Sequence, residues 1–156
     1  MTSPLNEKHY RLAESFGVSR SQIHVFDSLD KLKQSASSRG VANEEIEKYT
    51  EGTYGLNIRE NAQSGISFCE IFIRRNGHLD GGRESYDRFE RCGLQPSIRF
   101  MDNDGAFFYA FVLLHEIAHT LLNHDSQNSA EIYNRNELEA DEWAHARLME
   151  TPEFFQ

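Results

Sequence analysis

The sequence predicts an α+β fold, with short helices first, a small sheet in the middle and two long helices last. Residues 1–51 contain short segments with helical spacing. Residues 52–101 contain runs in which β-branched and aromatic residues alternate with polar ones, which is typical of strands. Residues 105–149 return to helical spacing. Since 156 residues is the size of one domain, we expect residues 1–156 to form a single domain.

Three short helices are expected in the N-terminal part. The first covers about residues 4–16, because Pro4 suits a first helical turn and Gly17 suits a C-terminal cap. A second covers about residues 28–40. A third begins at Asn43, whose side chain can cap the acidic turn that follows it.

The predicted sheet is small and mostly antiparallel. Residues 53–60 (TYGLNIRE) and 66–75 (ISFCEIFIRR) form two strands, with a turn at residues 61–65. Residues 76–82 (NGHLDGG) are turn-forming and end the second strand. Residues 97–101 (SIRFM) are the third candidate strand.

Composition and charge exclude two classes of partner. The chain has 25 Asp and Glu against 16 Lys and Arg, a net charge of −9, so a phosphate backbone would repel it. Its longest apolar run, residues 106–114, falls far short of the roughly 20 residues that span a bilayer. The first twelve residues lack the apolar core of a signal peptide. We therefore expect a cytoplasmic protein that binds neither nucleic acid nor membrane.

The most informative feature is the segment LLHEIAHTLL, which contains the pattern H-E-x-x-H. His115 and His119 are four residues apart, so on a helix both imidazoles can reach one Zn²⁺. Glu116 lies about 100° around that helix from His115, beside the metal, where it can act as the base for a water molecule. Apolar residues flank the motif on both sides, and polar groups on so buried a helix need partners.

A third ligand is expected downstream, because a catalytic zinc site has three protein ligands and an open position. In NELEADEWA, Glu137 and Asp141 are four residues apart and share a helix face. Glu137 would complete the ligand set, and Asp141 would accept the ring N–H of a ligand histidine. Asp125 and His124 remain alternative ligands, although Leu122 stands where related sites need a glycine.

These motifs resemble those of the gluzincin metallopeptidases, in which H-E-x-x-H is followed by E-x-x-x-D. The longer pattern FVLLHEIAHTLLNH…NELEADEWAHARLME is similar to the ImmA/IrrE-like branch. The resemblance implies one zinc ion held by His115, His119 and Glu137, with Glu116 as general base and Asp141 as the partner of a ligand histidine. It also implies a minimal zincin fold in which an H-E-x-x-H helix and a glutamate helix pack on a small sheet.

The expected activity is hydrolysis of peptide bonds in a protein or peptide substrate, in a regulatory role like that of ImmA. We expect an extended substrate to add to a sheet edge along residues 98–101. A donor for the transition state is still needed, and His145 is favoured because it follows Asp141 by one turn. A zinc-stabilised binding module without activity, or a toxin-like effector peptidase, are the alternative functions. The other possible donors are His78, Tyr86, Tyr109 and Tyr133.

Overall fold

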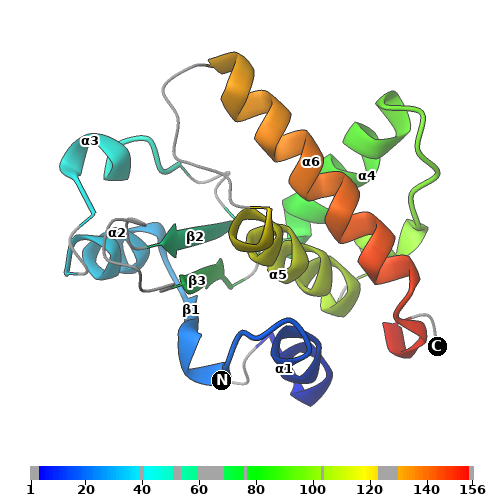
Figure 1. Cartoon of the computed structure of the whole chain (residues 1–156), viewed down its shortest axis with the longest axis horizontal. Helices are drawn as coiled ribbons and strands as arrows, with labels where there is room; N and C mark the ends of the chain where they lie inside the picture. Colours follow the sequence, from blue (N-terminus) through cyan, green and yellow to red (C-terminus); the bar gives the residue numbers. More distant parts are fainter. Residues whose placement is uncertain are drawn as a thin grey trace.

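The computed structural model shows a small sheet with helices on both faces (Figure 1). It describes residues 4–38, 41–50, 54–59, 69–75, 77–102, 104–122 and 130–154. The α-helices in this part of the chain are α1 (Glu7–Glu14), α2 (Leu29–Ser38), α3 (Asn43–Ile46), α4 (His78–Arg91), α5 (Ala106–Leu121) and α6 (Ala130–Met149). The strands are β1 (Ile23–Phe26), β2 (Gly55–Arg59) and β3 (Cys69–Arg74), and the short 3-10 helices are η1 (Arg20–Gln22), η3 (Ile98–Met101) and η4 (Pro152–Phe154).

The α+β prediction is confirmed, and the expected helices correspond to α1, α2, α3, α5 and α6. Helix α1 begins after Pro4, because the Asn6 side chain accepts from the Lys8 N–H and caps it. The His9 ring completes this cap by accepting from the Asn6 N–H at 2.9 Å. Gly17 follows α1 with φ +85°, the left-handed conformation that glycine adopts without strain.

The sheet is mixed, so the mostly antiparallel prediction was wrong. Its order is β1-β3-β2; β2 and β3 are antiparallel, whereas β1 and β3 are parallel. Strand β1 lies in a part of the chain where only helices were expected. Its sequence IHVF is rich in residues that favour strands, but it is only four residues long, so its pairing with β3 completes what the local sequence indicates. The turn expected at residues 61–65 lies outside the described residues.

The central strand β3 separates two clusters of apolar side chains. Ile71 and Ile73 pack into the larger cluster with α1, α5 and α6, while Phe72 packs with Leu32 and Ala36 of α2 on the opposite face. This is the alternation that a strand buried on both faces requires.

Helix α5 lies at the centre of the molecule, between the sheet and α6 (Figure 1). Its residues from Phe107 to Leu114 are all buried, as expected for a helix that is apolar on every side. The Phe100 ring meets the rings of Phe107 and Phe111 edge to face, with centroids 4.9 and 5.3 Å apart. Phe89 of α4 joins them 5.2 Å from Phe111, so these aromatic contacts fix α4 and η3 against α5.

The third strand expected at residues 97–101 is the 3-10 helix η3. Its Ser97 side chain accepts from the Arg99 N–H, and Phe100 is buried while Ile98 is 68% exposed. No strand edge is therefore present there to receive a substrate. The ring contacts of Phe100 with α5, which no local pattern indicates, hold the segment in this conformation.

The turn-forming segment at residues 76–82 ends strand β3 as expected, but its residues 78–82 belong to α4. Glycines weaken a helix in isolation, so the segment NGHLDGG favours a turn. Here the glycines permit close packing: a Cβ on Gly82 would lie 1.7 Å from the Phe100 carbonyl oxygen. A Cβ on Gly81 would lie 2.4 Å from the Phe108 ring. The packing against Phe100 and Phe108 explains why a helix begins where the sequence favours a turn.

None of the helices in the described ranges is long and apolar enough to cross a membrane.

Candidate metal centre

The two histidines of α5 lie against each other at the centre of the site. Their Nε2 atoms are 3.2 Å apart, and the ring planes are nearly perpendicular at 87°. Only 12% of the His115 side chain and 14% of the His119 side chain are exposed. The one-turn spacing therefore brings one nitrogen of each ring to the same point.

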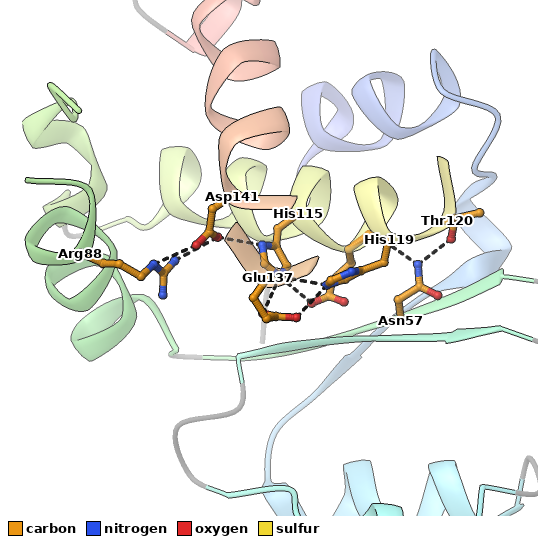
Figure 2. Close-up of polar contacts among 8 residues, drawn as sticks. Asn57, Arg88, His115, His119, Thr120, Glu137 and Asp141 are labelled. Atoms are coloured by element: carbon orange, nitrogen blue, oxygen red, sulfur yellow. Dashed lines mark hydrogen bonds and ion pairs between the residues drawn. The ribbon is translucent and has the colours of Figure 1, made fainter. Parts of the chain in front are cut away.

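Helix α6 brings Glu137 to both histidines (Figure 2). One carboxylate oxygen is 3.1 Å from His115 Nε2, and the other is 3.0 Å from His119 Nε2. Two imidazole nitrogens and one carboxylate thus converge, although Glu137 follows His115 by 22 positions in the chain.

Asp141 lies one helical turn beyond Glu137 and contacts the other side of the His115 ring. Its Oδ1 accepts a hydrogen bond from His115 Nδ1 at 2.8 Å, and 6% of its side chain is exposed. A hydrogen bond at Nδ1 fixes the orientation of the ring and directs Nε2 toward Glu137.

Arg88 of α4 extends this series of contacts and was not expected from the sequence. Its Nη2 donates to Asp141 Oδ1 at 3.1 Å, and its Nε lies 2.9 Å from Oδ2 (Figure 2). The arginine therefore contacts both oxygens of the carboxylate that holds His115. Its own helix was not predicted, so nothing in the local sequence indicated this contact.

Strand β2 lies directly against the part of α5 that carries the motif. The Asn57 amide donates to the Glu116 carbonyl and, at 2.6 Å, to Thr120 Oγ1 (Figure 2). A Cβ on Gly55 would lie 2.6 Å from Val112 and 3.3 Å from Glu116 Cγ. The only local signal for Asn57 is a polar residue in the middle of an alternating strand, which does not identify its partner.

At three groups of this site, burial acts on the pKa in one direction, and the neighbouring hydrogen-bond partners and opposite charges act in the other. Burial by itself lowers the pKa of His115, but the hydrogen bonds with Asp141 and Glu137 outweigh it and raise that pKa to about 10. Burial opposes ionisation of Glu137, yet its hydrogen bonds with His115 and His119 hold its pKa well below the ordinary range. Burial raises the pKa of Glu116, against the attraction of His115 and His119. In the metal-free site, a proton on the His115 imidazole would take the place of a cation.

The donor set fits zinc. Ligand atoms about 2.0–2.1 Å from a tetrahedral zinc are roughly 3.3 Å from one another. The contacts between His115, His119 and Glu137 are 3.0 to 3.2 Å, close to that value. Nitrogen and carboxylate oxygen are ligand types that zinc prefers. The group His115, Glu116 and His119 could also hold a metal ion by itself, since their ligand atoms lie within 4.8 Å of one another.

The expected transition-state donors lie in different surroundings. The His145 ring packs 5.2 Å from Phe89, and burial lowers its pKa. Tyr109 is buried and donates to the Arg74 carbonyl, so the core holds its hydroxyl. Tyr133 is 58% exposed and lies one turn before Glu137 on α6. The alternative ligands at residues 124 and 125 lie outside the described residues.

Residues 104–153 match the family model of peptidase U49. The peptidase U49 match covers α5 and α6, and with them His115, Glu116, His119, Glu137 and Asp141. It therefore supports a proteolytic function for the part of the chain that forms the candidate centre. Arg88 and Asn57 lie outside the matched segment. No curated protein and no solved structure matches the chain.

Proposed function

We propose that this chain is a zinc-dependent endopeptidase that hydrolyses peptide bonds of a protein substrate. The observation that carries the proposal is the convergence of His115, His119 and Glu137 within 3.0 to 3.2 Å of one another. The peptidase U49 match over the same helices supports it. His115, His119 and Glu137 would hold the metal, and Asp141 would orient His115.

Glu116 is the proposed general base. Its side chain is 8% exposed and lies 3.9 Å from His115 Nε2, next to the proposed ligands rather than among their shortest contacts. Bound zinc would polarise the scissile carbonyl and lower the pKa of a water molecule to about 7. Glu116 would accept a proton from the attacking water and pass it to the leaving amine. Burial raises the pKa of Glu116 above the ordinary value of a carboxyl group.

The substrate is expected to bind along β2 instead of residues 98–101. In the part of the chain that the structure describes, β2 is an edge of the sheet and lies against α5 at Glu116. An extended peptide that pairs with such an edge would pass close to the proposed base. From the resemblance to the ImmA/IrrE-like branch, we propose a regulatory protein substrate in the cytoplasm.

The test is a comparison of the wild-type chain with Glu116→Gln. We expect both to bind one zinc per chain, measured by mass spectrometry of the metal. Only the wild type should generate new N-termini in a proteome, with a loss of at least about 100-fold in the variant. Glu142→Gln is the matched control, because Glu142 is exposed on α6 and the change in charge is the same.

Two outcomes would contradict the proposal. Full cleavage by Glu116→Gln with zinc bound would exclude Glu116 as the base. Stoichiometric zinc without any Glu116-dependent cleavage would instead favour a zinc-stabilised binding module.

A further inference from the structure

The contact between Arg88 and Asp141 joins α4 to the candidate centre. Arg88 Nη2 donates a hydrogen bond to Asp141 Oδ1 at 3.1 Å, and Arg88 Nε makes an ion-pair contact with Oδ2 at 2.9 Å, so the contact is made at two points, one of which is a hydrogen bond. One charge-assisted hydrogen bond and one ion-pair contact, made to different oxygens, restrain the plane of the carboxylate as well as its position. Because Oδ1 also contacts His115 Nδ1 at 2.8 Å, the plane of the carboxylate determines where the His115 ring points.

The surroundings explain why Asp141 needs this partner. Its side chain is 6% exposed, and it lies one turn from Glu137, which is also a carboxylate. A buried carboxylate close to other acids and to a dication could rotate and compete as a ligand. Arg88 is its positive partner from a different helix, and the guanidinium occupies the side of the carboxylate opposite His115 (Figure 2).

Packing of α4 holds the arginine in place. The neighbouring residue Phe89 is buried and meets Phe100 and Phe111, while the Arg88 guanidinium lies 5.6 Å from the Phe89 ring. The arginine therefore projects from a helix anchored in the aromatic core. A side chain on a mobile loop could not fix a carboxylate in the same way.

We propose that Arg88 is a positioning residue of the metal centre. By holding both oxygens of Asp141, it fixes the His115 ring with Nε2 directed at the metal, and so sets metal affinity and coordination geometry. This inference rests on the proposed zinc site, and it adds to that site a residue from outside the peptidase U49 match.

The experiment measures zinc affinity of the full chain by competition with a chromophoric chelator. Arg88→Gln should bind zinc about 10-fold more weakly than the wild type, at the lower end of the effect of removing the direct partner of a metal ligand, because Arg88 acts through Asp141. Arg88→Lys retains the charge but not the two-point contact, so its zinc affinity should lie between those of the wild type and of Arg88→Gln. Arg91→Gln on the same helix is the control and should stay within about twofold of the wild type, because Arg91 is exposed.

A double-mutant cycle distinguishes a positioning role of Arg88 from a purely structural ion pair between α4 and α6. If Arg88 acts through Asp141, then Arg88→Gln should add little to the loss of zinc affinity caused by Asp141→Asn. The Co²⁺-loaded Arg88→Lys protein should also show a changed visible spectrum, which reports coordination geometry. A purely structural ion pair would lower the melting temperature of the metal-free chain without changing either readout.

The outcomes distinguish this inference from the proposed function. Wild-type zinc affinity and an unchanged cobalt spectrum in folded Arg88→Gln would overturn the inference alone. A wild-type chain that binds no zinc would overturn the proposed function and the inference together. If Arg88→Gln fails to fold, Arg88→Lys decides between the same outcomes.

Discussion

At the scale of single residues, the candidate centre depends on contacts with defined partners. Arg88, Asp141, His115, Glu137 and His119 form one continuous series of hydrogen bonds and ion pairs, each 3.2 Å or shorter. Three helices contribute to the series, so a change in any member should affect the others. Removing one partner of such a buried group generally lowers the free energy of unfolding more than the same change on the surface does.

One residue-scale prediction concerns the transition-state donor. We expect Tyr133→Phe to lower kcat about tenfold to 100-fold with little change in zinc affinity, because Tyr133 precedes Glu137 by one turn on α6. His145→Gln tests the donor expected from the sequence, although the His145 ring packs against Phe89. Initial rates at saturating substrate decide between them. A loss of activity in His145→Gln but not in Tyr133→Phe would support His145.

A second residue-scale prediction concerns pH. His9 is fully buried, accepts from the Asn6 N–H and donates to the Ala106 carbonyl at 2.8 Å, which requires a neutral ring. Burial lowers its pKa below the ordinary 6.5, although the Ala106 carbonyl opposes this. Below pH 6.5 the unfolded chain therefore binds more protons than the folded chain at this residue, and the stability contributed by neutral His9 falls with pH.

The measurement compares His9→Gln with the wild type by urea unfolding between pH 7.5 and 5. At pH 7.5 the free energy of unfolding of the variant should be about 1 kcal/mol lower than that of the wild type, because glutamine keeps one of the two hydrogen bonds. The difference between the two proteins should shrink as the pH falls. A difference that grows toward pH 5 would contradict the assignment of a neutral His9.

At the scale of elements, close backbone contacts determine where the helices lie. Helix α4 approaches η3 so closely at Gly82 that no side chain fits, and β2 approaches α5 in the same way at Gly55. The first contact places Arg88 beside Asp141, and the second places Asn57 beside Glu116. The glycines lower the helix propensity of α4, which was not predicted, whereas the alternating pattern predicted β2 despite Gly55.

The prediction for this scale is that Gly82→Ala destabilises the fold by about 2–3 kcal/mol. The new Cβ would meet a backbone carbonyl at 1.7 Å, which a side-chain rotation cannot relieve. Gly17→Ala is the comparison: its surroundings are open, so only the strain of φ +85° remains, about 1–2 kcal/mol. Chemical denaturation gives both values. Only Gly82→Ala should also weaken zinc binding, because it displaces the helix that carries Arg88.

At the scale of the whole molecule, the proposed metal links folding to function. The chain carries a net charge of −9, and one bound zinc would reduce this to −7 if the ligand histidines are neutral. The proposed ligands come from α5 and α6, so a cation would join the two helices. A metal that binds only the folded chain stabilises it in proportion to its affinity.

We therefore expect zinc at 100 times its dissociation constant to stabilise the chain by about 2.7 kcal/mol. Because residues 1–156 are predicted to form one domain, calorimetry should show a single transition that moves upward with zinc. Glu137→Gln should largely abolish the shift, and the exposed Glu142→Gln should preserve it. Two separate transitions would contradict the single-domain prediction.

The sequence alone determined the features that depend on local spacing. His115 and His119 are one turn apart, and so are Glu137 and Asp141, so each pair shares a face on any regular helix. The long apolar stretch before the motif likewise required burial of α5. Helix geometry alone is enough to derive these properties.

Only the tertiary structure determined which elements meet. Strand β1 exists because it pairs with β3, and η3 is helical because Phe100 enters the aromatic core. Arg88 and Asn57 reach the centre from elements distant in sequence, through glycine contacts that local propensity opposes. Packing and pairing energies between distant segments outweigh propensity differences of less than about 1 kcal/mol per residue. The local sequence therefore could not reveal which elements meet.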